Sequence, residues 1–113
     1  MITVYHNPRC SKSRQGLALV AESGKEFEVV KYLDAPVSEE KLTEIIQLLG
    51  ISPWALVRKS EAIWKSHFKD KDLTETELIQ AMVQHPKLME RPIVVNGKKA
   101  TVGRPPEKIL DIL

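Results

Sequence analysis

Residues 1–14 read Met1-Ile2-Thr3-Val4-Tyr5-His6-Asn7-Pro8-Arg9-Cys10-Ser11-Lys12-Ser13-Arg14. The first five residues form a short apolar run with β-branched and aromatic side chains, which predicts a strand. Residues 16–21 have helix-forming content, and Gly24 suits the left-handed C-terminal cap of a helix. Ser11 or Ser13 can cap the start of this helix. The run therefore predicts a strand, a polar turn and a helix, with Cys10 at or just before the N-terminus of the helix.

This placement predicts an activated thiol at Cys10. A strand-to-helix turn directs backbone N–H groups and the positive end of the helix dipole at whatever occupies it, which favours a thiolate and a bound oxyanion. The pKa of a free thiol, about 8.5, falls to roughly 3.5–7.5 in such places, helped by neighbouring cations. The candidate cations are His6, Arg9, Lys12 and Arg14. A small buried cysteine is the structural alternative, and the joint spacing His-x3-Cys-x3-Arg favours the nucleophile.

The rest of the chain extends this start into a complete fold. A second strand at 27–33 makes a βαβ unit with a parallel pair. Residues from about 38 to 88 carry helix caps and apolar i, i+3, i+4 spacing, which predict helices. Residues 91–102 predict a hairpin at Asn96-Gly97, and a last helix follows. We therefore expect one α/β domain over 1–113, with a thioredoxin-like fold and a helical insertion (38–88) between its N-terminal βαβ and C-terminal ββα parts.

The peptide bond between Arg91 and Pro92 is a feature that the sequence leaves open. Analogy with the fold is compatible with a cis bond, whereas only about 5–6% of X–Pro bonds in folded proteins are cis. Pro92 opens its expected strand, a position where proline is tolerated in a sheet.

Composition excludes several classes of function. Apolar residues make up 42% of the chain and charged residues 28%, as in an ordinary globular protein. The net charge of +2 is too small to indicate nucleic-acid binding, and no apolar run is long enough for a membrane span. No signal-peptide pattern is seen, and one cysteine permits no internal disulfide, so we expect a reducing cytoplasm. Neither a metal-ligand cluster nor a glycine-rich nucleotide loop is visible, so no metal or bound cofactor is expected.

Five short motifs, in order and at near-fixed spacing, resemble the glutaredoxin-coupled (ArsC-like) arsenate reductase family, and within it the YfgD-like branch. The resemblance covers essentially the whole chain. The motifs are His6-Asn-Pro-Arg-Cys10-Ser-Lys-Ser-Arg14, Tyr32-Leu-Asp, Leu56-Val-Arg58-Lys59, Leu88-Met-Glu-Arg91-Pro-Ile-Val-Val and Gly103-Arg104-Pro-Pro-Glu.

The resemblance implies a role for six residues. Cys10 matches the nucleophile that attacks arsenate, and His6 and Arg14 match the flanking residues that would keep the thiol ionised. The residues that match the three oxyanion-binding arginines are Arg58, Arg91 and Arg104. Guanidinium groups suit this task, because their planar forks bind tetrahedral oxyanions through two hydrogen bonds.

The resemblance also implies a source of electrons. Glutathione and glutaredoxin complete the reduction in this family, so glutathione is expected as a co-substrate and glutaredoxin as a partner. The cysteine count agrees independently, because a single cysteine leaves no resolving thiol among these residues.

The motif around Cys10 departs from the family and keeps other functions open. This chain reads Arg9-Cys10-Ser11-Lys12-Ser13, where well-studied members carry Ala-Cys-Gly-Thr-Ser. The added cations favour an anion, but the physiological oxyanion stays open. One alternative is a glutathione-linked thiol protein that acts on another oxyanion or forms a mixed disulfide. Another is an Spx-like regulator that binds RNA polymerase and senses oxidation through Cys-x-x-Cys; Ser13 at the second position excludes that disulfide. The oligomeric state and the glutaredoxin-docking surface also stay open.

Overall fold

The computed structural model describes all residues from 1 to 113 and divides them into two compact units. The first unit is Met1–Ala35 with Arg91–Leu113, and the second is Pro36–Glu90. The second unit contains the predicted helical segment 38–88. The single domain over 1–113 stays a prediction.

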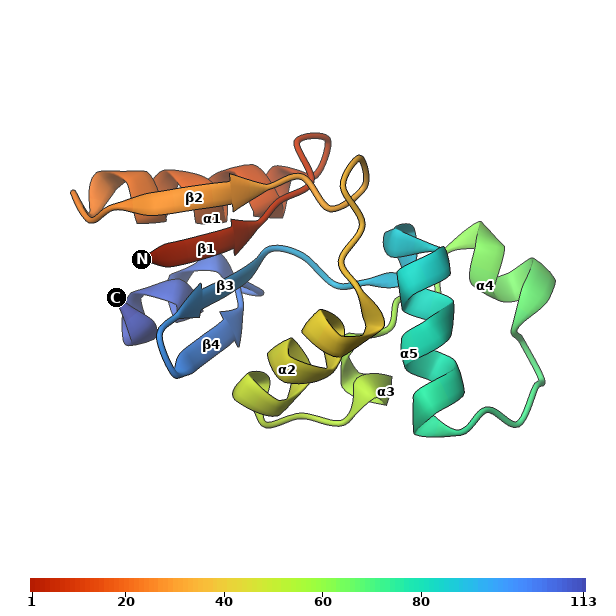
Figure 1. The fold of residues 1–113 in the computed structure, drawn as a ribbon. Helices are drawn as coiled ribbons and strands as arrows, with labels where there is room; N and C mark the ends of the chain where they lie inside the picture. Colours follow the sequence, from red (N-terminus) through yellow and green to blue (C-terminus); the bar gives the residue numbers. More distant parts are fainter. The chain divides into compact units, whose positions relative to one another are not determined.

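The first unit is built on a four-stranded sheet. Its strands are β1 (Ile2–Tyr5), β2 (Phe27–Val30), β3 (Ile93–Asn96) and β4 (Lys99–Val102). The strand order is β2-β1-β3-β4, with β1 parallel to β2 and the other two pairs antiparallel. Helix α1 (Ser11–Glu22) connects β1 to β2, and the 3-10 helix η2 (Pro106–Ile112) follows β4 (Figure 1). This arrangement confirms the predicted α/β, thioredoxin-like fold.

The second strand is shorter than the sequence predicts. It ends at Val30, where the expected strand continues to Leu33. The chain turns at this point because the N–H groups of Asp34 and Ala35 both donate to the carbonyl of Lys31. Residues 31–33 therefore leave the sheet just after β2.

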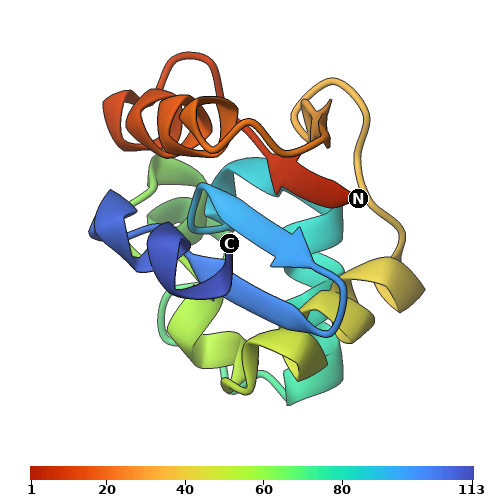
Figure 2. The same ribbon diagram turned by 90° about the vertical axis from the view of Figure 1, so that its left-hand side faces the viewer.

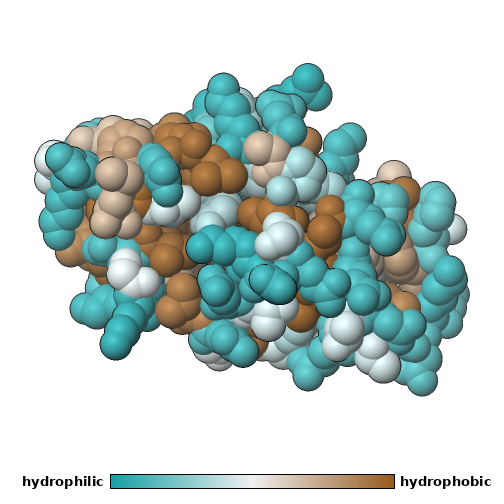
Figure 3. Space-filling model, in the orientation of Figure 1, coloured by the Kyte–Doolittle hydropathy of each residue, from teal (hydrophilic) through white to brown (hydrophobic).

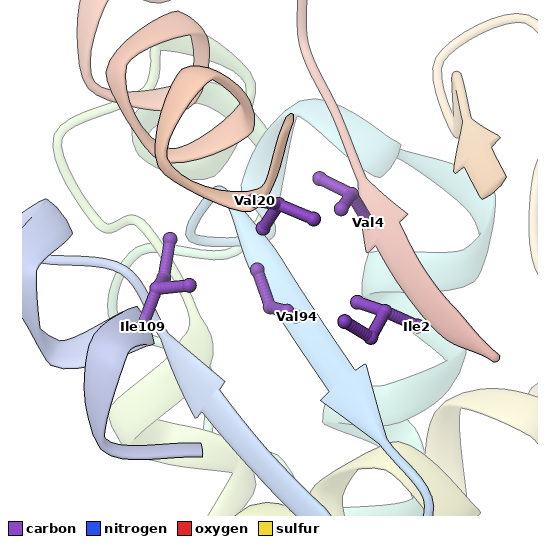
Figure 4. Packing of buried hydrophobic residues seen from close by; sticks show 5 residues of the cluster. All are labelled: Ile2, Val4, Val20, Val94 and Ile109. Carbon is purple, nitrogen blue, oxygen red and sulfur yellow. The ribbon is translucent and has the colours of Figure 1, made fainter. Parts of the chain in front are cut away.

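One apolar cluster holds α1 and η2 against the sheet (Figure 4). Its members are Ile2, Val4, Val20, Val94 and Ile109. Val4 and Val94 are partners in the antiparallel pair β1–β3, so their side chains share one face of the sheet. Figure 2 shows α1 and η2 on the same side of β1 and β3. This packing fixes the N-terminus of α1 at the carboxyl end of β1, which is where the turn with Cys10 lies.

The second unit is helical. Its elements are α2 (Glu39–Leu49), α3 (Pro53–Leu56), α4 (Ala62–His67), α5 (Glu75–Gln84) and the 3-10 helix η1 (Pro86–Leu88). The predicted caps are present: Ser38 accepts from the Lys41 N–H, and Thr74 forms a capping box with Glu77. Gly50 ends α2 in the left-handed conformation, as the sequence predicts. Local signals therefore account for the bounds of α2 and α5.

Trp54, Trp64 and Phe68 form an aromatic cluster in this unit. The Trp54 and Trp64 rings meet edge to face with centroids 5.9 Å apart, and Trp64 stacks on Phe68 at 5.6 Å. Trp64 is buried. Trp64 thus belongs to the core of the unit, and Trp54 packs against it at a partly exposed position.

The face drawn in Figure 3 carries mostly hydrophilic residues with apolar ones between them. Four large apolar side chains are exposed: Met1, Val29, Leu48 and Leu110. Single exposed apolar residues are normal on protein surfaces. None of the helices has the length and apolar character that a bilayer crossing requires.

Two peptide bonds are cis, Arg91–Pro92 and Arg104–Pro105. The sequence left the isomer of the first open and gave no indication of the second.

Candidate active site

Cys10 is the N-cap residue of α1. Its backbone is extended, with φ −96° and ψ 123°, and its carbonyl accepts the N–H of Arg14 at 3.0 Å. The Cys10 N–H donates to the carbonyl of Asn7 at 3.1 Å, which closes the turn after β1. The prediction that Cys10 lies at the start of the helix is confirmed. The prediction that Ser11 or Ser13 caps the helix is wrong, because Cys10 holds the cap position and Ser13 is the buried third residue of the helix.

The surroundings of Cys10 lower the pKa of its thiol. Partial burial acts in the opposite direction, because it disfavours the charged thiolate. The backbone N–H groups of Ser13 and Lys12 and the guanidinium of Arg91 outweigh burial, so the pKa lies below its ordinary value of 9.0. More of the thiol is therefore ionised at neutral pH than in a free cysteine.

Arg91 and Arg104 place two guanidinium groups beside the sulfur. Nη1 of Arg104 lies 4.0 Å from Sγ of Cys10 and also donates to the carbonyl of Arg91 at 3.2 Å. Nε of Arg91 is buried and has no hydrogen-bond partner. A buried hydrogen-bond donor without an acceptor costs free energy. When the donor belongs to a cation, an anionic oxygen is the favoured acceptor. These two predicted binding residues are thus brought together with Cys10.

Arg14 makes a contact with the turn. Its side chain is exposed, and Nη1 donates to the carbonyl of Pro8 at 2.9 Å. This bond ties the first turn of α1 back onto the residues that precede Cys10. Its charge also acts on His6, whose pKa it lowers.

His6 is buried, with 5% of its surface exposed, and its Nδ1 lies 2.7 Å from the hydroxyl of Ser13. Burial lowers the pKa of His6 below the usual 6.5, and the charges of Lys31 and Arg14 lower it further. A hydrogen bond with the backbone of Ser13 acts in the opposite direction and is outweighed. These surroundings disfavour the imidazolium, and the expectation that His6 helps to keep the thiol ionised stays a prediction.

Ser13, which the sequence does not single out as a site residue, belongs to the site. Its side chain is fully buried, and its hydroxyl accepts the N–H of Asn7 at 3.0 Å. Its own N–H helps to lower the pKa of Cys10. The spacing Cys10-x-x-Ser13 was the available signal, since an N-cap side chain faces the N–H groups of the second and third helical residues.

Arg58 belongs to the second unit, whereas Cys10 belongs to the first. It follows α3, where Nε donates to Glu61 at 3.3 Å and Nη1 to Glu90 at 3.2 Å. Its side chain is 17% exposed. Its part in oxyanion binding stays a prediction.

No three His, Cys, Asp or Glu side chains are grouped so that they could hold a metal ion. Around Cys10 the structure brings together one thiol, two guanidinium groups and the N–H groups of a helix terminus, a set that suits nucleophilic attack on an oxyanion.

Comparison with known proteins finds similar sequences and structures that cover nearly the whole chain. The sequence pattern of the ArsC family matches residues 5–112. The uncharacterized protein YfgD of Escherichia coli K12 is 50% identical over 114 residues, which cover 99% of this chain and 96% of YfgD. An arsenate reductase of Haemophilus influenzae is 42% identical, with 99% and 98% covered. The solved structure of an arsenate reductase from Vibrio cholerae is 45% identical, covers 99% of this chain and 97% of its own, and superposes with a TM-score of 0.94. With its site and fold in agreement, this chain belongs to the ArsC family.

Proposed function

We propose that this protein is an arsenate reductase in which Cys10 is the nucleophile and glutathione, with glutaredoxin, supplies the electrons. Two relatives that cover nearly the whole chain, from Haemophilus influenzae and Vibrio cholerae, are named arsenate reductases. The observation that carries the proposal is the sulfur of Cys10 at the helix terminus, with Arg104 4.0 Å away and an unpaired Nε on Arg91. Together they offer a nucleophile and a place for a tetrahedral oxyanion.

The first step is substitution at arsenic. The Cys10 thiolate attacks As(V), a sulfur–arsenic bond forms, and one arsenic–oxygen bond breaks. The departing oxygen takes up protons and leaves as water. Arg91 and Arg104 hold the remaining oxygens and offset their negative charge. The arsenic is still As(V) after this step, so an external reductant is required.

The second stage is a two-electron reduction by external thiols. The overall balance is arsenic acid plus two glutathione molecules giving arsenious acid, one glutathione disulfide and water. Only one cysteine is present in the chain, so the second sulfur of any disulfide formed on Cys10 comes from glutathione. Glutaredoxin then resolves the mixed disulfide and restores the thiolate. Such chemistry suits a reducing cytoplasm.

Three more residues have parts in this proposal. Arg58 serves as a third oxyanion ligand and shares its guanidinium with Glu61 and Glu90. Arg14 keeps the turn closed through its bond to Pro8. His6 contributes as a neutral group through its contact with Ser13.

Arsenite production by the purified protein tests the proposal. With arsenate, glutathione and glutaredoxin we expect turnover, which is abolished in Cys10→Ser and retained in the matched variant Ser11→Ala. Ser11 is exposed at the first position of α1, so its hydroxyl is a suitable control. Omitting glutaredoxin should slow turnover strongly. Full activity of Cys10→Ser would refute the nucleophile.

One observation favours a second substrate. The exposed Arg9 and Lys12 add positive charge to the turn around Cys10. No arsenite turnover, combined with alkylation of Cys10 at pH 6, would favour another oxyanion or glutathione mixed-disulfide chemistry at the same thiol.

A further inference from the structure

Ser13 makes two hydrogen bonds inside the first turn of α1, and both reach the end of β1. Its hydroxyl accepts the Asn7 N–H at 3.0 Å and lies 2.7 Å from Nδ1 of His6. Ser13 is fully buried and His6 is 5% exposed. Water therefore has little access to this pair, so the donors and acceptors of both side chains must find their hydrogen-bond partners within the protein.

The protons of the pair can be assigned by counting donors and acceptors. The Asn7 N–H uses one lone pair of the Ser13 oxygen. The hydroxyl proton then needs an acceptor, and Nδ1 of His6 is the one within reach. If Nδ1 carried a proton, the second lone pair of the Ser13 oxygen would accept it, and the hydroxyl proton of Ser13 would be left without this acceptor. The hydroxyl proton of Ser13 has its acceptor when His6 is neutral and carries its own proton on Nε2, which leaves Nδ1 free to accept.

We propose that Ser13 is a positioning residue: its hydroxyl donates to Nδ1 of a neutral His6, accepts from Asn7, and so anchors the first turn of α1 to the end of β1. The backbone N–H of the same serine faces the sulfur of Cys10. The side chain of Ser13 thus fixes the direction of a donor that its main chain offers to the thiolate. In this way the neutral His6 acts on Cys10 through Ser13, without a charge of its own.

The charged groups around this pair agree with the assignment. Lys31 and Arg14 act on His6, and both are cations that oppose a second positive charge on the ring. Arg91 and Arg104 act on Cys10. Guanidinium groups and backbone donors therefore stabilise the negative charge of the thiolate, and a positive charge on the imidazole is not needed for this. This inference deepens the proposed function, since it concerns the same thiol.

Nitrogen NMR of the unaltered protein tests the tautomer. With 15N-labelled histidine at neutral pH, we expect the Nδ1 resonance of His6 at the position of an unprotonated ring nitrogen and Nε2 at that of a protonated one. His6→Gln assigns the resonances. A protonated Nδ1, whether in the other tautomer or in the imidazolium, would overturn the proposal. This measurement does not depend on the folding of any Ser13 variant.

Alkylation of Cys10 by iodoacetamide as a function of pH tests the anchoring role. Ser13→Ala should move the midpoint of the profile up by about one pH unit, so alkylation well below the midpoint slows by about tenfold. Ser11→Ala is the matched control and should keep the midpoint of the unaltered protein. A folded Ser13→Ala protein with an unshifted midpoint would show that the hydroxyl does not position the donor.

Neither measurement uses arsenate. If the NMR and alkylation results are as expected but no arsenite is produced, the proposed substrate is wrong and the role of Ser13 is supported. If arsenite is produced and Ser13→Ala leaves the alkylation profile unchanged, the reductase stands and the role of Ser13 falls.

Discussion

Donors of two kinds surround the sulfur of Cys10: backbone N–H groups of the first turn of α1 and the guanidinium groups of Arg91 and Arg104. The first kind is a local consequence of helix geometry. The second is contributed by residues more than 80 positions away in the sequence. Because the guanidinium groups also bind anions, substitutions here are expected to change thiol reactivity and oxyanion affinity together.

Arg91→Ala is expected to weaken binding of arsenate or sulfate roughly tenfold to a hundredfold. The reason is that it removes charged hydrogen bonds, each worth about 1.5–3 kcal/mol. Isothermal titration calorimetry with Cys10→Ser as background measures this affinity without turnover. Arg9→Ala, which removes an exposed arginine from the same turn, is the control and should have a smaller effect. Equal affinities for the Arg91→Ala variant and its parent would contradict the assignment.

The pKa shift of Cys10 also predicts how stability changes with pH. The folded protein holds the pKa of the thiol below its ordinary value of 9.0, so the unfolded chain binds the proton more readily. The resulting stabilisation is fully present above pH 9 and is lost as pH falls through the folded pKa. Urea denaturation from pH 5 to pH 9 should therefore show the unaltered protein gaining free energy of unfolding with rising pH, relative to Cys10→Ser. A difference that is constant over this range would count against a stabilised thiolate.

At the scale of elements, α1 approaches η2 and the start of β3 at a glycine. A Cβ at Gly16 would lie 2.7 Å from Cγ of Pro92 and 2.8 Å from Cδ1 of Ile109, closer than such contacts allow. Glycine in the middle of a helix is otherwise unfavourable. The close approach of α1 to Pro92 and Ile109 explains why a glycine stands at position 16. The same contact couples the position of α1 to Pro92, which follows Arg91.

Gly16→Ala is expected to destabilise the protein by about 1–3 kcal/mol, since the new methyl group must push apart a packed interface. The gain in helix propensity from alanine offsets only part of this. Thermal denaturation followed by circular dichroism measures the effect. Gln15→Ala, at an exposed position of the same helix, is the control and should change stability little. A melting temperature equal to or above that of the parent would show that the interface yields without cost.

The N-cap of α2 is a second element-scale feature. Ser38 accepts the N–H of Lys41 at 3.1 Å, so Ser38→Ala should cost about 1 kcal/mol of stability. Urea denaturation measures the loss, with Ser60→Ala, an exposed serine outside any cap, for comparison. Equal losses in the two variants would mean that the cap is not responsible.

At the scale of the whole molecule, the chain has one thiol and no internal disulfide. Oxidation by glutathione disulfide at neutral pH should therefore add one glutathione per protein, at Cys10. Intact-mass spectrometry measures the adduct, which reduced glutaredoxin should remove. Cys10→Ser should stay unmodified. An adduct on that variant, or none on the parent, would argue against the thiol-exchange stage of the proposed reaction.

Most of the fold was predictable because its signals are local. The Asn96-Gly97 hairpin, the Thr74 capping box and the glycine at the end of α2 each act within a few residues. The end of β2 was less predictable, because residues 31–33 have strand-like side chains and a turn of backbone hydrogen bonds removes them from the sheet. The cap of α1 was also misassigned, since serine at Ser11 or Ser13 is a stronger capping signal than cysteine.

The sequence by itself determined the order of strands and helices and the place of Cys10 at a helix N-terminus, because capping, turn and periodicity signals depend on neighbours along the chain. Only the tertiary structure decided the charge preference of His6 and brought Arg104 to a cysteine 94 positions away. Burial and contacts between distant segments set these properties. The same His6 would be half-ionised near pH 6.5 in an unfolded chain, and it becomes a neutral partner of Ser13 only when β1, α1 and the segment around Lys31 are folded together.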